Sequence, residues 1–185
     1  MTDRPDIRPL MAGFPSGVSV LTTLRAGAEP TGMTCSSLAS VALAPPTLVV
    51  CLRTASPTAQ AALDSGRFAL NLLHEDARAT SDRFASGTAD KFGGTDWRLP
   101  LNAAGPHLAA DARAIADCTV VHTVPAGDHT AVFAEVRRVT VFPDAPGPLL
   151  YGLRQYARWS DAIAGPALEP TPAAAALPGG TRAGG

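Results

Sequence analysis

Short runs of apolar and β-branched residues, separated by glycine, proline and polar clusters, make up most of the first half of the chain. Residues 47–52 form a continuous apolar run behind Pro45 and Pro46, which is typical of a buried central strand. Similar runs occur further along, and they predict a protein built mainly from strands. The other predicted strands cover residues 17–23, 31–43, 67–73, 115–124, 130–142 and 149–151.

Two helices are predicted between these strands. Residues 57–64 follow Ser56 at an N-cap position, Pro57 occupies the first helical position, and Gly66 ends the segment. A second helix is expected over residues 76–85. The two long runs of the second half are joined by a polar turn at residues 125–129, which predicts a hairpin. The pattern favours an antiparallel barrel with peripheral helices over a doubly wound parallel sheet.

The composition of the chain predicts one folded domain. Its 185 residues suit a single domain with a short tail. Residues 165–185 are almost entirely Ala, Pro and Gly without a periodic apolar face, so this segment is predicted to be disordered. The predicted domain spans residues 8–162, and residues 1–10 form an N-terminal segment that overlaps its start.

Charge and apolar patterning exclude several functional classes. The formal net charge of −1 gives no basic field for nucleic acid, and no apolar run approaches the length of a bilayer span. The N-terminus lacks the apolar core of a signal peptide, so we expect a soluble cytoplasmic protein without membrane partners. Three widely spaced cysteines argue against a disulfide framework, and the four histidines show no metal-binding spacing. Rossmann and P-loop glycine motifs are also missing from the sequence.

The first candidate site is a cluster of small hydroxyl residues just before the buried strand. Hydroxyls and backbone amides in such a segment can form hydrogen bonds to a flat polar ring. The alternative is an edge strand or turn that tolerates serine. The cluster comprises Thr34, Cys35, Ser36, Ser37 and Ser40.

The second candidate site lies where the buried strand leads into the first predicted helix. Arg53, Ser56 and Thr58 would meet the free N–H groups and the positive dipole end of that helix, a combination that binds phosphate. The alternative is an ordinary serine cap.

The third candidate site is the turn of the predicted hairpin. His129 would project there beside Asp128, exposed enough to donate to a ligand and close to its titration range near neutral pH. The alternative is a turn in which Asp128 bonds its own backbone.

Taken together and in this order, several segments resemble the short-chain flavin reductase family, the reductase components of two-component flavin monooxygenases. The resemblance covers about residues 8–159, and each segment alone is only weak evidence for the family. The matching segments are residues 14–18, 32–41, 45–49, 68–73, 83–85, 90–92, 127–130 and 148–151, followed by Tyr156.

The resemblance implies a fold and a set of site residues. The fold would be a homodimer of six-stranded split barrels with the flavin near the subunit interface. Thr34 to Ser37 and Ser40 would line the flavin ring and ribityl chain, Ser56 and Thr58 would hold the 5′-phosphate, and His129 and Tyr156 would face the nicotinamide. The remaining implied residues are Cys51, Leu52 and Arg53 along the ring, and Arg83, Phe84, Lys91 and Phe92 by the phosphate or the ring edge.

The implied activity is reduction of FMN, with FAD as the alternative, by NADH or NADPH, and delivery of the reduced flavin to a partner monooxygenase. His129 is the one residue assigned a catalytic role, and no metal is expected. Two alternatives are a non-enzymatic FMN-binding or electron-transfer protein on the same barrel, and an enzyme similar to pyridoxamine-phosphate oxidase.

Overall fold

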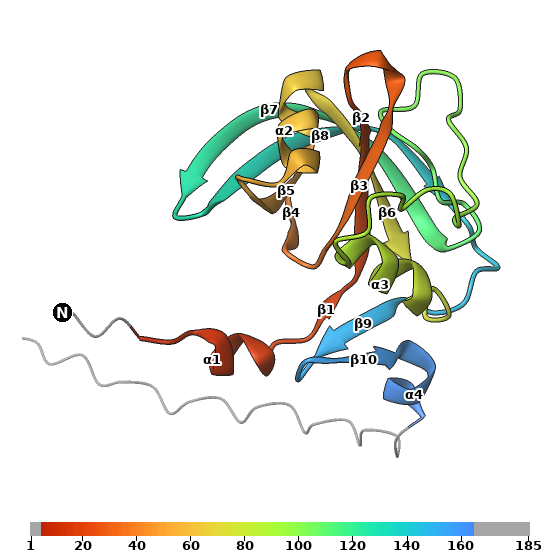
Figure 1. Ribbon diagram of the computed structural model, residues 1–185. Helices are drawn as coiled ribbons and strands as arrows, with labels where there is room; N and C mark the ends of the chain where they lie inside the picture. Colours follow the sequence, from red (N-terminus) through yellow and green to blue (C-terminus); the bar gives the residue numbers. More distant parts are fainter. Residues whose placement is uncertain (1–4, 165–185) are drawn as a thin grey trace, which may run out of the picture.

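The computed structural model describes residues 5–164, and the predicted disordered tail lies outside this range. Figure 1 shows a large curved sheet with helix α2 against it, and a small sheet below it that carries α1 and α4. Every strand pairing is antiparallel. The prediction of a mainly β fold with peripheral helices is therefore confirmed.

The large sheet has seven strands in the order β3-β2-β6-β7-β8-β5-β4, whereas six were predicted for the barrel. The small sheet has the order β1-β9-β10. The strands are β1 (Ser16–Gly17), β2 (Ser19–Leu24), β3 (Pro30–Cys35), β4 (Leu38–Leu43), β5 (Pro46–Arg53), β6 (Arg67–Leu73), β7 (Ala112–Ala126), β8 (His129–Val141), β9 (Leu149–Gly152) and β10 (Gln155–Arg158). The helices are α1 (Arg8–Ala12), the 3-10 turn η1 (Ala26–Ala28), α2 (Pro57–Ser65), α3 (Arg78–Ala85) and α4 (Trp159–Ile163).

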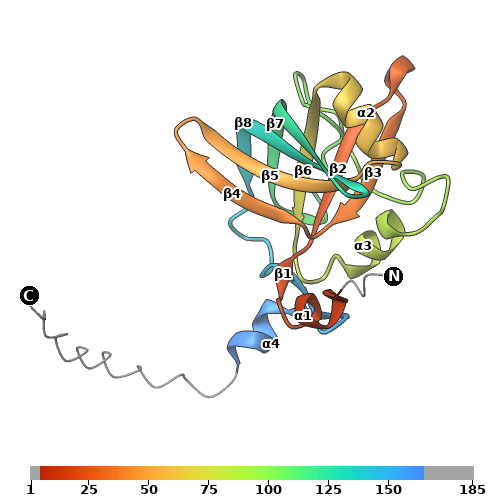
Figure 2. The same ribbon diagram turned by 90° about the vertical axis from the view of Figure 1, so that its left-hand side faces the viewer.

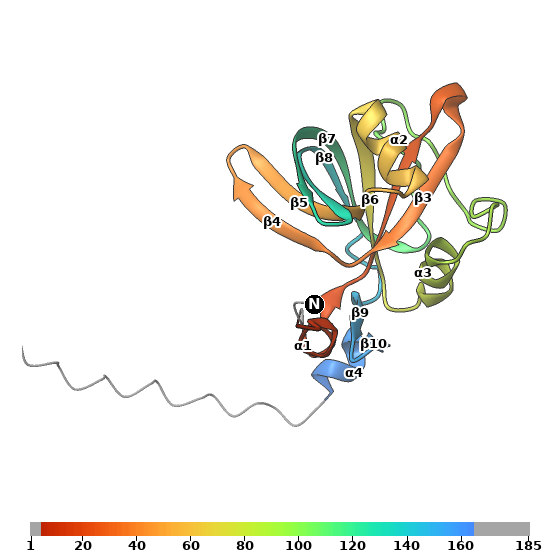
Figure 3. The same ribbon diagram turned by 60° about the vertical axis from the view of Figure 1, so that its left-hand side comes forward.

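The prediction of one extended stretch over residues 31–43 is wrong. The chain breaks at Ser36 and Ser37 into β3 and β4, which form the two opposite edges of the large sheet. β3 pairs with β2, and β4 pairs with β5. Figures 2 and 3 show the β2–β3 and β4–β5 pairs diverging from their meeting point, so that the curled sheet stays open between its edges. Because β3 is an edge strand, one row of its backbone polar groups is available to a ligand.

Helix α2 closes one side of the main core. Ser56 caps it, since its side chain accepts a hydrogen bond from the Ala59 N–H, and Gly66 ends it in the left-handed conformation at φ 67°. Ala59 and Ala62 face the sheet and are almost fully buried, against Leu21, Phe68 and other core residues. The opposite face of the helix is exposed. The helix is therefore fixed by local capping and by burial of one narrow apolar face.

A long irregular segment, residues 86–111, is held on the sheet by buried polar side chains. The Asn71 amide donates to the carbonyls of Val20 and Pro106 and accepts from the Leu108 N–H. The Asp117 carboxylate accepts from the Ala104 N–H at 2.6 Å and bonds the His107 ring at 3.0 Å. These contacts order a segment that has no regular secondary structure of its own, and Lys91 lies at its beginning.

Candidate functional site

The structure forms a pocket of about 360 Å³ where the N-terminus of α2 meets β3 and the segment after α3. Three of the residues predicted to bind the flavin phosphate, Ser56, Thr58 and Lys91, line it together. Phe92 also lines it. The other lining residues are Arg25, Glu29, Pro30, Thr31, Gly32, Met33, Pro57, Ser86, Gly87, Thr88 and Ala89. We call this space the phosphate pocket.

The helix end supplies hydrogen-bond donors to the phosphate pocket. The Ser56 hydroxyl accepts from the Ala59 N–H at 3.4 Å and makes a contact of the same length with the Met33 sulfur. Sulfur is a weak acceptor, so the hydroxyl proton of Ser56 is free to turn to a stronger one. Thr58 is buried, and its hydroxyl bonds that of Thr31 at 2.8 Å. At the second helical position its backbone N–H has no intrahelical partner, so this donor is available to a ligand at the helix end.

Lys91, the only lysine of the chain, supplies positive charge. Its ammonium group donates to the Phe84 carbonyl at 2.8 Å and approaches the Gly32 carbonyl at 3.4 Å, which leaves a third proton for a ligand. Burial lowers the pKa of Lys91 from its ordinary value. A bound phosphate would oppose this effect, because a nearby negative charge favours the protonated amine. The donor set of the pocket thus suits a phosphate group.

Aromatic packing fixes the position of Lys91. The Phe92 ring next to it makes edge contacts with Phe84 at 5.1 Å and with Trp97 at 5.5 Å between ring centroids. Phe84 is almost fully buried, where it belongs to a core cluster with Leu73 and Leu108. Its ring therefore supports the pocket from behind, although the resemblance implied a position near the phosphate or the ring edge.

A second pocket, of about 540 Å³, lies at the far end of β3, and we call it the ring pocket. Ser36, Ser37 and Cys51 line it, as the resemblance implied for the flavin ring. The Ser37 hydroxyl donates to the Cys51 carbonyl at 2.6 Å, and the Cys51 N–H donates to the Ser37 carbonyl at 3.1 Å. The other lining residues are Arg8, Met11, Ala12, Phe14, Ser16, Leu38, Ala39, Val49, Tyr151, Gly152, Leu153 and Arg154.

The edge strand β3 connects the two pockets. Gly32 and Met33 line the phosphate pocket, and Ser36 just beyond the strand lines the ring pocket. Thr34 and Cys35 lie between them, but their side chains serve the fold. The Thr34 hydroxyl donates to the Ser81 carbonyl at 2.7 Å, and the buried Cys35 thiol contacts the Ser19 hydroxyl at 3.2 Å. Burial raises the pKa of Cys35 to about 11, so it remains a neutral thiol.

His129 and Tyr156 were predicted to face the nicotinamide together, but they lie far apart in the folded chain. His129 begins β8 at the hairpin turn, where its ring bonds Asp128 at 2.7 Å, and it pairs with Arg53 of β5. The hydrogen bond to His129 lowers the pKa of Asp128 from its ordinary value. Tyr156 lies in the small sheet, where its hydroxyl bonds Ser81 at 2.9 Å. Figure 1 shows the hairpin end and β10 well separated.

The remaining predicted residues are also dispersed. Leu52 is buried in the main core, and the Arg83 guanidinium lies against Gly94. Ser40 lies on β4 in an apolar depression with Leu43 and Val136. Each of these side chains is thus placed outside the two pockets.

Two groups of residues that line the pockets were not predicted from the sequence. Arg25 enters the phosphate pocket from the β2–β3 turn, and Met11, Phe14 and Tyr151 form much of the apolar wall of the ring pocket. Phe14 and Tyr151 lie in segments that resemble the family, and this resemblance could have identified them as site residues. Arg25 lies outside every matching segment, so only the folded hairpin reveals it.

Comparison with known proteins identifies the family. Residues 11–160 match the model of the flavin reductase like domain. The chain belongs to this family. The matched range contains both pockets' predicted residues and His129.

Proteins that are similar to this chain are flavin reductases or related oxidoreductases. A flavin reductase (NADPH) from Lentzea aerocolonigenes is 44% identical over 155 residues, which cover 84% of this chain and 89% of that protein. The reductase subunit HsaB of a flavin-dependent monooxygenase from Mycobacterium tuberculosis is 37% identical over 150 residues, covering 80% of this chain and 79% of the subunit. The solved structure of the NADH:FAD oxidoreductase SgcE6 from Streptomyces globisporus superposes with a TM-score of 0.77 at 29% identity, covering 83% of this chain and 90% of that one.

The predicted family and enzyme class, an NAD(P)H-dependent flavin reductase, are confirmed by these relatives. They favour the reductase over a non-enzymatic flavin carrier or an enzyme similar to pyridoxamine-phosphate oxidase. Within residues 5–164, no helix has both the length and the apolar character needed to cross a membrane.

Proposed function

We propose that this chain binds FMN, with FAD as the alternative, along β3 and reduces it with NADH or NADPH for a partner monooxygenase. The observation that carries the proposal is the pair of pockets at the two ends of one edge strand. The flavin supplies the redox chemistry when it is bound, by accepting a hydride from the nicotinamide. The chain's own residues would bind the flavin, orient it and shield it. The site belongs to a single domain, which we assign to residues 8–162.

The two pockets match the two ends of a flavin in their chemistry. The phosphate pocket combines the Ser56 hydroxyl, the Thr58 N–H and the Lys91 ammonium, all of them donors. The ring pocket combines serine hydroxyls with apolar and aromatic side chains, which suits a flat ring with polar edges. The backbone of β3 between them would accompany the ribityl chain.

The nicotinamide is assigned to His129 and Tyr156, which requires a second copy of the chain. Within one copy these residues lie apart, at the hairpin end and in the small sheet. We propose a homodimer in which the hairpin of one copy reaches the ring pocket of the other. The rim of that pocket supports this arrangement, because Phe14 and Leu153 are 67% and 72% exposed there. His129 would then orient the nicotinamide as a hydrogen-bond donor.

The partner is proposed to be a monooxygenase component that receives reduced flavin. The support is the similarity of this chain to HsaB, the reductase subunit of a flavin-dependent monooxygenase. Delivery requires that reduced flavin leave the site, and the open, solvent-facing edge of the curled sheet is compatible with such exchange.

The proposal is tested by mixing the purified chain with NADH or NADPH in air and following absorbance at 340 nm, with and without FMN or FAD. The expected result is nucleotide oxidation that depends on added flavin. Tight flavin binding without oxidation of either nucleotide would indicate the carrier alternative instead. A Lys91→Gln variant should raise the flavin concentration needed for half-maximal rate, since it removes the pocket's ammonium group.

A further inference from the structure

The turn between β9 and β10 holds a backbone conformation that its residues disfavour. Leu153 and Arg154 form the two-residue loop of this hairpin, between Gly152 and Gln155, which pair with each other. Both loop residues have positive φ angles, 50° at Leu153 and 61° at Arg154. Hairpin loops of this kind normally use Asn and Gly, because a Cβ atom is crowded in the left-handed conformation. Strain of this sort persists mostly where a binding or catalytic site requires it.

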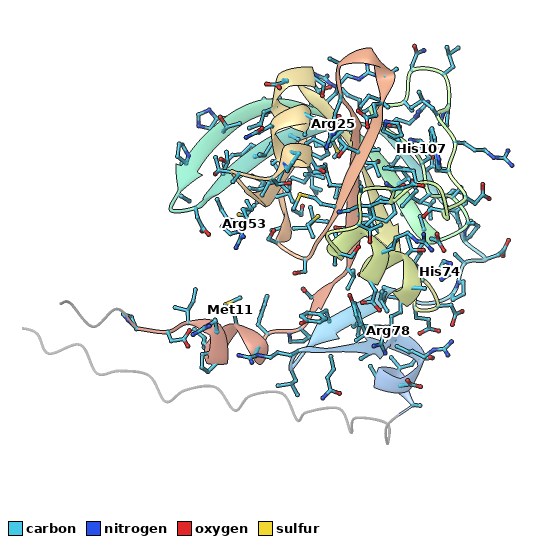
Figure 4. All side chains as sticks on the ribbon, viewed as in Figure 1. Met11, Arg25, Arg53, His74, Arg78 and His107 are labelled. Carbon is cyan, nitrogen blue, oxygen red and sulfur yellow. The ribbon has the colours of Figure 1, made fainter. Side chains whose placement is uncertain are left out.

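The strained turn is fixed at the rim of the ring pocket by the segment before β1. The Leu153 N–H donates to the Ala12 carbonyl at 2.6 Å, directly after α1 places Met11 in the same pocket. Figure 4 shows Met11 projecting from α1 on the side of the large sheet. Met11, Leu153 and Arg154 all line the ring pocket. The turn therefore holds the Arg154 backbone at a defined place on the rim.

The lining of the ring pocket carries positive charge and no carboxylate. Arg8 and Arg154 are its only charged residues within the described range 5–164. Arg8 already bonds the Asp6 carboxylate at 2.8 and 2.9 Å. Arg154 is exposed, and within the described residues its guanidinium takes part in no ion pair. An oxidised flavin ring is neutral, so this guanidinium is suited to a different, anionic group.

The hydride donor brings such a group to this rim. Its nicotinamide must lie against the flavin ring inside the pocket, so its adenosine end extends outward over the rim. NADPH differs from NADH by a phosphate monoester on the adenosine ribose, and a phosphate monoester carries close to two negative charges at neutral pH. A guanidinium bonds such a group through two parallel N–H donors, and arginine accommodates the same phosphate in other nucleotide-binding folds.

We propose that Arg154, assisted by Arg8, binds the 2′-phosphate of NADPH and makes NADPH the preferred hydride donor. The inference rests on the proposed function, because it assumes that the flavin ring occupies the ring pocket and that the nicotinamide stacks on it. A ligand-binding arginine explains why the turn keeps a residue that glycine would replace with less strain. The pyrophosphate of NADH and NADPH offers similar chemistry, and the experiment separates these two phosphate sources.

The experiment measures dissociation constants for NADP⁺ and NAD⁺ by calorimetry with FMN present, in the wild type and in Arg154→Gln. The wild type should bind NADP⁺ at least tenfold more tightly than NAD⁺. Arg154→Gln should lose roughly 10- to 100-fold in NADP⁺ affinity, the scale of a charge-assisted hydrogen bond, and the preference should nearly disappear. Arg154→Lys should retain part of it, since the charge remains without the planar fork. Arg8→Gln should have a smaller effect, because Asp6 already engages Arg8.

Arg154→Gly separates ligand binding from folding. Glycine adopts the left-handed conformation without strain, so the melting temperature should stay the same or rise. The NADP⁺ affinity should nevertheless fall as it does in Arg154→Gln. Arg137→Gln is the matched control, because Arg137 is an exposed arginine on β8 that does not line the ring pocket. This control should change neither constant.

Three outcomes overturn the inference and leave the proposed function intact. Equal losses for NADP⁺ and NAD⁺ in Arg154→Gln would assign the guanidinium to the shared pyrophosphate. A wild type that binds NAD⁺ as tightly as NADP⁺, or an unchanged NADP⁺ constant in Arg154→Gln, would also exclude the 2′-phosphate contact. A wild type that oxidises neither NADH nor NADPH with added flavin overturns both proposals.

Discussion

Ser56 combines two functions in one hydroxyl group. Its oxygen caps α2 through the Ala59 N–H, while the hydroxyl contacts the sulfur of Met33, which also lines the phosphate pocket. A cap contributes about 1 kcal/mol to stability whether or not a ligand is present. Phosphate binding would add a charge-assisted hydrogen bond that only phosphorylated flavins can make. The two functions can therefore be separated by the choice of ligand.

We predict that Ser56→Ala weakens FMN binding by roughly 10- to 150-fold, the equivalent of a lost bond worth about 1.5–3 kcal/mol. Riboflavin binding should change far less, because riboflavin lacks the phosphate. Fluorescence titration with both flavins measures this difference. Equal losses for the two flavins would mean that Ser56 only caps the helix.

A second prediction concerns His129, whose ring is held by the Asp128 carboxylate at the hairpin turn. His129→Ala should raise the KM for NAD(P)H and slow turnover by roughly 10- to 100-fold, the scale of one or two lost hydrogen bonds. The flavin dissociation constant should stay nearly constant. Asp128→Asn should have a smaller effect, because an amide can still bond the ring. Loss of flavin binding in His129→Ala with a normal KM would place the hairpin in the flavin pocket instead.

At the level of elements, the close contact between β3 and α3 supports the phosphate pocket. A Cβ atom at Gly32 would lie 2.8 Å from the nearest carbon of the Phe84 ring, closer than real contacts allow. Phe84 is buried among Val20, Leu73 and Leu108, so its ring has little room to move. The glycine therefore permits the approach that positions the Phe84 carbonyl for Lys91.

We predict that Gly32→Ala destabilises the protein by about 1–3 kcal/mol, the usual cost of an overpacked core. Gly17→Ala is the matched control, because a Cβ atom there meets nothing within 4 Å. Urea denaturation of the three proteins provides the comparison. Equal stability of Gly32→Ala and wild type would show that α3 moves away without cost.

The segment that carries Lys91 is tied to the sheet by a charged cluster. Burial alone would raise the pKa of Asp117, but hydrogen bonds from the Ala104 N–H, His107 and Arg138 outweigh it and hold that pKa below its ordinary value. A carboxyl with a lowered pKa in the folded state stabilises the protein above its unfolded pKa of about 3.9. This contribution is lost as the pH falls through the lower, folded-state pKa.

We predict that Asp117→Asn is less stable than wild type by about 2 kcal/mol at pH 7, since the Arg138 guanidinium then loses its negatively charged partner and one acceptor oxygen is replaced by an NH₂ group. The difference should narrow as the pH falls below about 4, because the carboxyl of the unfolded chain is protonated first, and it should vanish as the pH falls through the lower folded-state pKa, where the folded carboxyl becomes neutral too. Denaturant melts at pH 7, 5 and 3 measure this change. A difference that is constant over the whole range would exclude a contribution from the charge of Asp117.

On the scale of the whole molecule, large apolar side chains gather around α1 and the β9–β10 turn. Leu10, Phe14 and Leu153 are all exposed there, next to or within the rim of the ring pocket. Exposed apolar surface of this kind favours association. The proposed dimer would cover it and complete the site with residues from a second copy.

We predict a particle of twice 18.9 kDa in light scattering at micromolar concentration. Leu10→Asp should shift the mass toward that of one chain and reduce flavin affinity at the same time. Leu101→Asp is the control, because Leu101 is 86% exposed and does not line the ring pocket. A wild-type mass of 18.9 kDa would exclude the dimer.

The sequence alone determined the elements whose causes are local. Ser56, Pro57 and Gly66 mark the ends of α2 within the chain itself, and the predicted helix over residues 57–64 corresponds to Pro57–Ser65. The hairpin of β7 and β8 follows likewise from two long β-rich runs around one polar turn. Ordered family motifs added the enzyme class and several residues of both pockets.

Only the tertiary structure decided the rest, because strand pairing connects residues that are distant in the sequence. Residues 31–43 have the composition of one strand, but their two halves pair with β2 and β5 on opposite sides of the opening. The same pairing turns Cys35 inward, buries Leu52 and brings Arg25 next to α2. Hydrogen bonds across the sheet fix which side chains share a pocket, and no local pattern encodes those partners.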